Sequence, residues 1–367
     1  MTRAFRAPGR VNLIGEHTDY NLGFVLPIAL DLACVATSAP AGDGRLHVST
    51  ENLGKSGEWD IAGLASRAPA GDWTDYVIGV ARELIAAGYP LSAQRIRVHS
   101  SVPAGSGLSS SAALEVSLAL AMLDGRPIEP LELAQLCQRA ERGFVGVPSG
   151  IMDQYVAIFG REGSAIEIDC RSLTHQVVTL PRDVRILAVN SMVKHQLGQS
   201  AYRQRTEECA AAVEIIRTRY PQTRSLRDVD SGILAEMEGQ LPEPIRRRAR
   251  HVVSEDERVG QFVAACGAGD VARMGRLFVQ SHRSLQLDYE VSCAELDFLV
   301  DTAVGMNGVF GARMTGGGFG GCTVNLVDPA AAAGFESEIA KRYEQRFAVR
   351  PQVFGCRPSG GAAEIRA

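Results

Sequence analysis

The sequence lacks the long apolar stretches of a membrane or secreted protein. No run approaches the roughly 20 consecutive apolar residues that span a bilayer, and residues 1–6 contain nothing like the apolar segment of a signal peptide. These absences argue against membrane insertion and export. We therefore expect a cytoplasmic protein without a membrane partner.

Closely spaced cysteines are missing as well. The eight cysteines lie far apart, and none forms a C-x-x-C pair. This spacing argues against a structural zinc site and against a compact disulfide framework. We expect reduced thiols that are buried in the core.

A dominant charge of one sign is also absent. The 38 Lys and Arg residues against 42 Asp and Glu residues give a formal net charge of −4, too little positive field to hold nucleic acid. The densest basic run, residues 246–248 with Arg250, is followed by acidic residues at 255–257. We expect both runs to lie on a solvated helix surface. The expected partners are small molecules, and the protein is expected to be a monomer.

The length and the apolar content indicate a folded protein of two domains. A chain of 367 residues exceeds the size that one core usually serves, and 46% hydrophobic residues is ordinary for a globular protein. The sequence shows no repeat, low-complexity tract or long polar linker. We place the boundary near Pro181, which gives domains at 1–181 and 182–367.

The order of the expected elements predicts an α+β protein. Ile96 and Val98 alternate with charged residues as in a half-buried strand, and a turn-rich segment then leads into an apolar helix at 112–122. The other expected elements are a helix at 130–144, strands within 164–187, a mostly helical region at 200–301 that opens at 200–202, and a strand pair flanking 316–321.

The strongest local signal is the glycine- and serine-rich segment 102–112, between a strand and a helix. Gly105 and Gly107 let backbone N–H groups approach an anion, and the free N–H groups of the first helical turn add favourable partial charge. The segment matches neither the P-loop nor the dinucleotide fingerprint. We interpret it as a phosphate-binding loop whose serines can face Mg²⁺. A tight turn with a serine cap is the alternative.

A second segment, residues 7–21, places four polar side chains between apolar flanks: Arg10, Glu16, His17 and Asp19. Sugar hydroxyls need paired donors and acceptors, so such a cluster suits a carbohydrate. The alternative is a solvated surface loop.

A third segment, residues 314–322, has five glycines among positions 316–321, followed by an apolar strand at 323–327. Glycines before a strand allow either a ligand or another backbone to come close. The sequence alone favours neither.

In this order and spacing, the three segments resemble the signature motifs of the GHMP kinase superfamily, and residues 7–21 resemble the galactokinase signature within it. The likeness continues through 150–154, 190–202 and 281–293. It implies a two-domain α+β GHMP kinase fold, with a ribosomal-protein-like N-terminal domain and a ferredoxin-like C-terminal domain that carries a helical insert.

The resemblance implies an ATP-dependent kinase that phosphorylates the anomeric hydroxyl of galactose. The residues implied to bind ATP are Gly105, Gly107, Ser109, Ser110 and Ser111 at the phosphates, with Trp73 and Tyr76 beside the adenine. Those implied to bind Mg²⁺ are Ser110 or Ser111 and Glu141.

The resemblance also implies which residues bind the sugar and act on it. The implied sugar contacts are Arg10, Glu16, His17, Asp19, Gly150, Asp153 and Tyr202, with Asp153 as the base and Arg10 beside it. Asp153 has apolar neighbours, so its carboxylate is expected to be partly buried and to need a partner, for which Arg10 is suited. Taken singly, Tyr202, His17, Trp73 and Tyr76 could instead be packed structural residues, and Glu141 a solvated helix charge.

Two other functions remain open from the sequence. A related kinase could act on N-acetylgalactosamine or arabinose, because the same phosphate loop serves every substrate. A sensor could bind galactose and ATP without transfer, but the intact serines of the loop, Arg10 and Asp153 argue against it.

Overall fold

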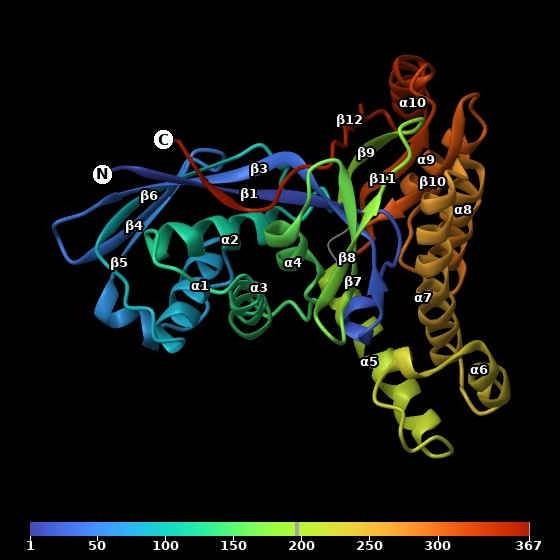
Figure 1. Ribbon diagram of the computed structural model, residues 1–367, viewed down its shortest axis with the longest axis horizontal. Coiled ribbons are helices and arrows are strands. Elements are labelled where there is room, and N and C mark those ends of the chain that lie inside the picture. The colour runs from blue at the N-terminus through green and yellow to red at the C-terminus, as the bar shows by residue number, and fades with distance from the viewer. Residues whose placement is uncertain (195–197, 367) are drawn as a thin grey trace.

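The computed structural model of the protein, which describes residues 1–194 and 198–366, has two lobes side by side along its long axis (Figure 1). One hydrophobic cluster runs through both lobes. It joins residues of the N-terminal sheet, such as Phe5, to residues of the second lobe, such as Phe262 and Val324. The two lobes therefore share a continuous core.

The N-terminal lobe is a six-stranded sheet with helices on one face (Figure 1). The sequence explains the layers: Ile96 and Val98 of strand β6 (Gln94–Ser100) point into the core while Arg95, Arg97 and His99 face out. The strands, in sheet order, are β13 (Ala363–Ile365), β1 (Arg3–Asn12), β3 (Pro27–Pro40), β6 (Gln94–Ser100), β4 (Arg45–Thr50) and β5 (Lys55–Asp60).

Four helices lie on this side of the sheet: α1 (Thr74–Ala86), α2 (Ser110–Leu123), α3 (Pro130–Arg139) and α4 (Met152–Phe159). Helices α2 and α4 contact its strands, and α1 and α3 pack on those two helices. Helix α2 is apolar on nearly all sides because it is enclosed between β1 and β3 and the other helices. Shorter turns are the 3₁₀ helices Asp19–Asn21, Ile61–Ser66 and Leu226–Asp228 and the π-helix Ala140–Val145.

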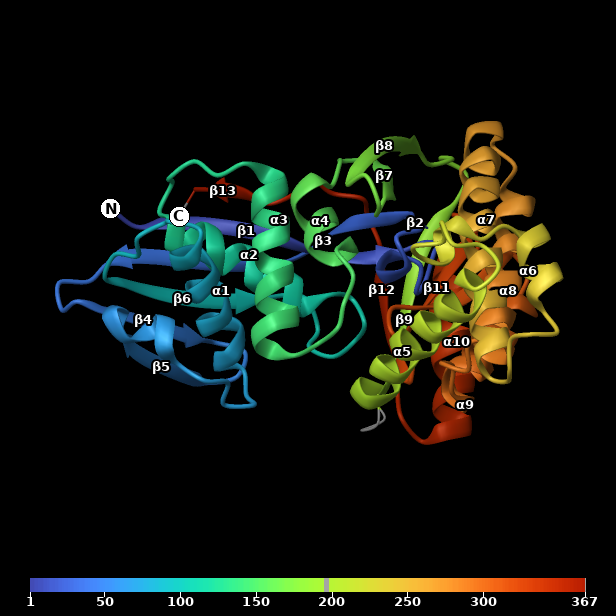
Figure 2. The same ribbon diagram turned by 90° about the horizontal axis from the view of Figure 1, so that it is seen from below.

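A small sheet lies between the lobes (Figure 2). Its antiparallel strands are β2 (Phe24–Val25), β7 (Ser164–Asp169) and β8 (Thr174–Thr179). Because β2 directly follows the polar segment of residues 7–21, this segment reaches the boundary between the lobes.

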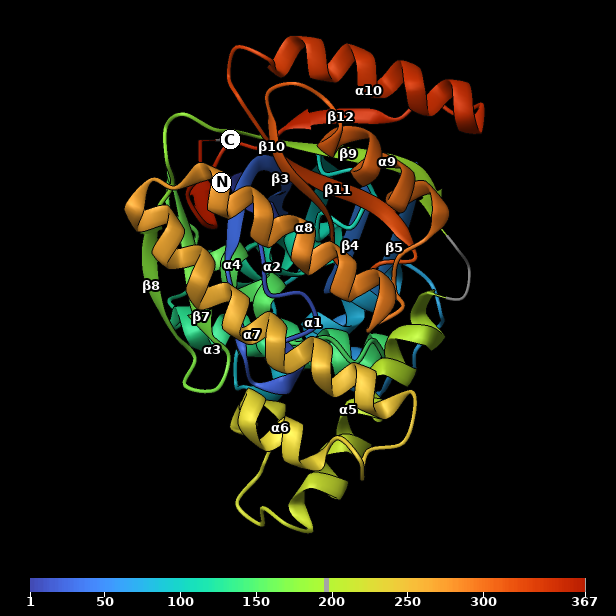
Figure 3. The same ribbon diagram turned by 90° about the vertical axis from the view of Figure 1, so that its right-hand side faces the viewer.

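The second lobe is an antiparallel sheet covered by long helices, of which α7 and α8 cross its outer side (Figure 3). The strands, in order, are β10 (Val309–Thr315), β11 (Gly320–Val327), β9 (Arg185–Lys194) and β12 (Gln352–Gly355). The helices are α5 (Gly198–Arg217), α6 (Ser231–Met237), α7 (Ile245–Ala268), α8 (Val271–Leu287), α9 (Ala294–Val304) and α10 (Ala332–Phe347).

The expected elements are confirmed, with small shifts at their ends. The helix expected at 130–144 is α3 continued by the π-helix, and the strand pair around the glycines is β10 and β11. Pro181 lies in the connection between β8 and β9, and the division at that point stays a prediction. The last strand, β13, returns to pair with β1 in the first sheet.

The expected solvated surface on α7 is wrong for two of its charges. Arg248 is 2% exposed because it pairs with Glu208 and Glu290, and Glu255 is fully buried. A charged run looks solvated in a sequence because its distant partners are not visible there.

The cysteines are free thiols, and all but the partly buried Cys293 are buried, as expected. Within the described ranges, 1–194 and 198–366, no helix combines the length and apolarity that crossing a membrane requires.

Candidate active site

A cavity of about 1020 Å³ opens where the three glycine-rich or polar segments meet. Its walls come from both lobes, which is where ligand sites commonly lie. The predicted site residues that line it are Arg10, Glu16, His17, Asp19, Tyr76, Gly105, Gly107, Ser109, Ser110, Ser111, Glu141, Gly150, Asp153 and Tyr202.

Trp73 is the predicted residue that this cavity does not include. It stands just before α1 and is packed, partly buried, against the main hydrophobic cluster. Its role beside an adenine stays a prediction. The contacts that the structure shows for Trp73 are those of a packed structural residue.

The phosphate-loop segment has the backbone of an anion-binding turn. Gly105 and Gly107 adopt φ of 72° and 79°, a region that glycine enters freely. Ser109 follows at φ 58°, and α2 begins at Ser110. Ser110 and Ser111, the first residues of α2, line the cavity, so the free N–H groups of this helix end are available to phosphate oxygens there.

The third segment packs its backbone against this loop. A β-carbon at Gly316 would lie 3.0 Å from the carbonyl oxygen of Gly107, and one at Gly321 would lie 3.0 Å from that of Ser106. Both glycines have positive φ. The structure thus answers the question that the sequence left open: another backbone comes close here, and the same glycines also line the cavity.

Arg10 and Asp153 form a two-pronged ion pair at the point where the loop and the polar segment meet. Arg10 Nε lies 2.7 Å from Asp153 Oδ1, and Nη2 lies 2.9 Å from Oδ2. Nη1 of Arg10 donates to the carbonyl oxygen of Gly107 at 2.6 Å. The Ser109 hydroxyl donates to Asp153 Oδ2. Such paired hydrogen bonds fix the carboxylate in orientation as well as in position.

Asp19 and Glu16 bring two more carboxylates to the same cavity. Burial, with the neighbouring charge of Asp153, raises the pKa of Asp19 to about 7. Glu16 uses Oε1 to accept from the Gly316 N–H at 2.8 Å and from the Thr315 hydroxyl at 3.0 Å. Its other oxygen has no such protein donor among the described contacts.

His17 is held among aromatic rings with one nitrogen unused. Its Nδ1 lies 2.9 Å from the Tyr20 hydroxyl, and its ring centre lies 5.4 Å from that of Tyr202. Burial lowers the pKa of His17 well below its ordinary value, so the ring is neutral. Within the described part of the chain its buried Nε2 has no hydrogen-bond partner, which suits a ligand hydroxyl.

Glu141 lies on the π-helix, a local widening that often marks a functional position. Its Oε2 accepts from the Ser149 hydroxyl at 2.5 Å and from Gln154 Nε2 at 3.0 Å, and it also bonds the Ser111 side chain. Burial raises the pKa of Glu141. Burial also raises the pKa of Tyr76, helped by the Glu141 charge, and both side chains line the cavity.

The residues present fit a Mg²⁺ bound together with phosphates. No group of three or more His, Cys, Asp or Glu suited to a metal occurs in the part of the chain that the structure describes. Mg²⁺ commonly takes only one or two carboxylates from the protein and completes its shell with water and phosphate oxygens. The serine hydroxyls and Glu141 supply that kind of oxygen.

Sequence reasoning missed the residues that hold these groups in place. Ser149 and Gln154 fix Glu141, and Thr315 fixes Glu16. Gln154 directly follows Asp153, so its place in the motif was a signal, whereas Thr315 is separated from Glu16 by almost the whole chain.

Comparison with known proteins identifies the family. Residues 75–161 match the GHMP kinase N-terminal domain, residues 2–40 the galactokinase galactose-binding signature, and residues 262–345 the GHMP kinase C-terminal domain. The chain is 46% identical to a galactokinase of Roseiflexus sp. (strain RS-1), covering 98% of this chain and 92% of that one. It is 44% identical to a galactokinase of Homo sapiens, covering 93% and 87%.

Solved structures agree with the sequence relatives. A Lactococcus lactis galactokinase complexed with galactose matches at a TM-score of 0.94 and 34% identity, covering 99% of this chain and 95% of that one. A mevalonate kinase of Methanococcus jannaschii shares the fold at a TM-score of 0.69 and 18% identity, over 97% and 98% of the chains. The two-domain GHMP kinase fold is confirmed, and the chain belongs to the galactokinase family of the GHMP kinases.

Proposed function

We propose that the protein transfers the γ-phosphate of ATP to the anomeric hydroxyl of D-galactose, giving galactose 1-phosphate and ADP. The observation that carries this proposal is the Arg10–Asp153 pair. Arg10 belongs to the same polar segment as Glu16, His17 and Asp19, and it bonds the phosphate loop at Gly107. The pair therefore joins the two parts of the cavity.

Asp153 would accept the proton of the sugar hydroxyl as the phosphoryl group transfers. An aspartate is far less basic than an alkoxide, so it cannot remove the proton beforehand. In a loose phosphoryl-transfer transition state the nucleophile needs little activation until bonding begins. The carboxylate therefore acts mainly by orienting the hydroxyl in line and taking the proton late.

Arg10 would keep Asp153 ionised and in place. Its guanidinium does not lose a proton near neutral pH, so it cannot itself be the base. Its Nη1 bond to the Gly107 carbonyl ties the base to the phosphate loop, so the hydroxyl that Asp153 orients faces the phosphate.

The phosphates of ATP would lie against Gly105, Gly107 and the N-terminus of α2, where backbone N–H groups and the helix dipole favour negative charge. Ser110 or Ser111 and Glu141 would hold Mg²⁺. When bound, Mg²⁺ supplies neutralisation of phosphate charge during the transfer.

The galactose hydroxyls would be read by groups with free hydrogen-bonding capacity. These are the Glu16 oxygen that faces away from Gly316, the unpartnered Nε2 of His17 and the Asp19 carboxylate. Gly150 and Tyr202 complete the wall. A site that bonds each hydroxyl rejects sugars that lack one or place it differently. The free cysteine thiols support a reducing, cytoplasmic setting.

The test is ADP release over a panel of galactose, N-acetylgalactosamine, glucose, arabinose and mevalonate, with the position of the product phosphate determined. We expect the highest turnover with galactose, and a product whose phosphate is on the anomeric oxygen. Preference for another sugar would contradict the proposed substrate. Binding of galactose and ATP without ADP release would identify a sensor.

A further inference from the structure

Helix α7 holds the backbone of the sugar segment (the polar segment of residues 7–21) through buried hydrogen bonds. Glu255 Oε1 accepts from the N–H of Gly15 at 3.0 Å and from the N–H of Glu16 at 3.3 Å. His251 Nε2, one turn earlier, lies 3.1 Å from the carbonyl oxygen of Glu16. The peptide groups that carry Glu16 are thus fixed by a helix some 240 residues further along the chain.

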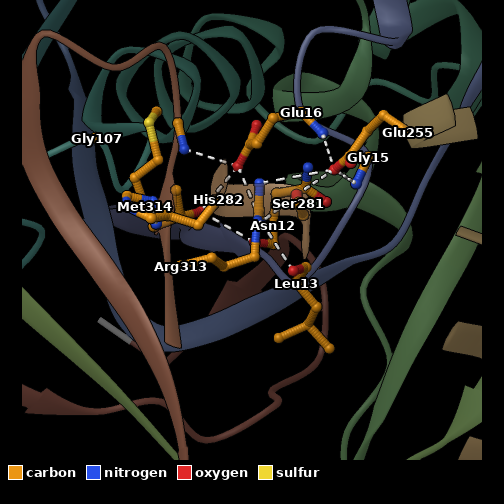
Figure 4. Close-up of polar contacts among 12 residues, drawn as sticks. Asn12, Leu13, Gly15, Glu16, Gly107, Glu255, Ser281, His282, Arg313 and Met314 are labelled. Atoms are coloured by element: carbon orange, nitrogen blue, oxygen red, sulfur yellow. Dashed lines mark hydrogen bonds and ion pairs between the residues drawn. The ribbon is translucent and has the colours of Figure 1, made fainter. Parts of the chain in front are cut away.

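Arg313 on β10 bonds to the backbone of the residues that precede Gly15. Its Nη1 donates to the carbonyl oxygens of Asn12 at 3.1 Å and Leu13 at 2.8 Å. It also lies 3.5 Å from Glu16 Oε1, and its Nη2 lies 3.9 Å from Glu255 Oε1. Figure 4 shows Arg313 and Glu255 beside the residues of this segment, Asn12, Leu13, Gly15 and Glu16.

The charges in this cluster are buried and matched. Glu255 and Arg313 are both 0% exposed, and Arg258 pairs with the second oxygen of Glu255 at 2.7 Å. Burial alone would raise the pKa of Glu255, but the Arg258 and Arg313 guanidiniums hold it well below its usual range. The carboxylate is therefore ionised and accepts hydrogen bonds through both of its oxygens.

The segment needs this support because one of its non-glycine residues, His17, has a strained backbone. Gly15 has φ 96° and His17 has φ 64°, so two of three consecutive residues adopt the left-handed region. Such a conformation persists in a non-glycine residue only when its surroundings hold it there. The Glu16 and His17 side chains of this turn both line the cavity.

We propose that Glu255 is a positioning residue for sugar recognition, whose reach across the core sets where Glu16 and His17 stand in the galactose site. The proposal rests on the proposed function, because it assumes that these side chains bind the sugar. It assigns Glu255 no contact with substrate.

Two substitutions separate reach from charge. Glu255→Asp keeps the charge that balances Arg258 and Arg313 but shortens the side chain, so the carboxylate withdraws from the Gly15 and Glu16 N–H groups. Glu255→Gln keeps the length and one acceptor oxygen but loses the charge and places an N–H₂ group against a guanidinium. If Glu255 positions the sugar-binding residues, Glu255→Asp should raise the galactose KM more than Glu255→Gln does. If Glu255 is purely structural, Glu255→Gln should be the more harmful substitution for both the galactose KM and the melting temperature.

The measurement is the KM for galactose, the KM for ATP, kcat and the melting temperature of each variant. We expect Glu255→Asp to raise the galactose KM about tenfold, with the ATP KM within about twofold of wild type. We expect Glu255→Gln to lower the melting temperature more than Glu255→Asp does, yet to raise the galactose KM less. If only one variant folds, a raised galactose KM with the ATP KM within about twofold of wild type supports the proposal, and an unchanged galactose KM overturns it.

Asp270→Ala is the matched control, because it removes the cap of α8 in the same lobe and touches no part of the sugar segment. It should lower the melting temperature and leave the galactose KM unchanged. The proposal is overturned if folded Glu255→Asp keeps the wild-type galactose KM, if Glu255→Gln is worse in both measurements, or if Asp270→Ala raises the galactose KM equally. Wild-type protein without turnover on galactose would instead overturn the proposed function.

Discussion

Gly150 lies against the Asp19 carboxylate so closely that a β-carbon at position 150 would overlap Asp19 Oδ2. Only a glycine leaves room for the Asp19 side chain here, and Asp19 is one of the proposed sugar-binding residues. Gly150, two residues before α4, and Asp19, which opens the first 3₁₀ helix, are fitted to each other although they are far apart in the chain.

Gly150→Ala should displace the Asp19 carboxylate and weaken galactose binding. We expect a loss of about 1–3 kcal/mol in galactose binding, the range for a buried hydrogen-bonding group left without its partner, with ATP affinity unchanged. Titration calorimetry with each ligand measures both. Gly143→Ala is the control because a β-carbon there meets open space. Unchanged galactose affinity in Gly150→Ala would separate Asp19 from the sugar.

Asp19 should make the sugar-free protein less stable as the pH rises. The folded protein keeps a proton on Asp19 up to about pH 7, whereas the unfolded chain releases it near its ordinary pKa of 3.8. The free energy of unfolding therefore falls between these two values and levels off above pH 7. Asp19→Asn removes this penalty, so the variant should exceed wild type by on the order of 1–3 kcal/mol at pH 8.

Urea unfolding of both proteins from pH 4.5 to pH 8 checks this, and the advantage of the variant should shrink steadily toward the acid end. A difference that is constant across the range would show that Asp19 does not carry the titration. The same variant should bind galactose more weakly, because the amide offers one acceptor oxygen in place of two.

Glu141→Gln should raise the Mg²⁺ requirement of the reaction. The amide keeps the shape and one acceptor oxygen for Ser149, but it lacks the negative charge that suits Mg²⁺. We expect the Mg²⁺ concentration for half-maximal rate to rise at least about tenfold. Glu83→Gln, a carboxylate paired with Arg139 on the surface, should leave it unchanged. A wild-type Mg²⁺ dependence in Glu141→Gln would make Glu141 a structural group.

Much of the fold and the site could be predicted because the signals are local. The phosphate loop shows its glycines and the start of its helix within a dozen residues, and the alternation around Ile96 and Val98 shows the strand before it. The need of Asp153 for a partner was predictable from chemistry, since a carboxylate among apolar residues requires one, and the family resemblance pointed to Arg10.

The remaining features depend on contacts across long sequence separations. Glu255 looks like one charge of a solvated run until α7 packs on the sugar segment, and Thr315 looks like a strand residue until its hydroxyl meets Glu16. Trp73 is packed, partly buried, against the core, and its place beside an adenine stays a prediction. Periodicity reports which face of an element is buried, not which partner it meets.

The central claim is that Asp153 is the proton acceptor, and Asp153→Asn tests it most directly. The amide keeps the shape but loses the charge and the proton acceptor, so kcat should fall at least about a hundredfold. Calorimetry should show that galactose and ATP still bind, and a thermal melt should show that the variant is folded although Arg10 has lost its partner. With binding retained, the decisive measurement is kcat at saturating galactose and ATP. The account predicts near loss of turnover, and a kcat within about tenfold of wild type, equivalent to only ~1.4 kcal/mol in the barrier, would contradict it.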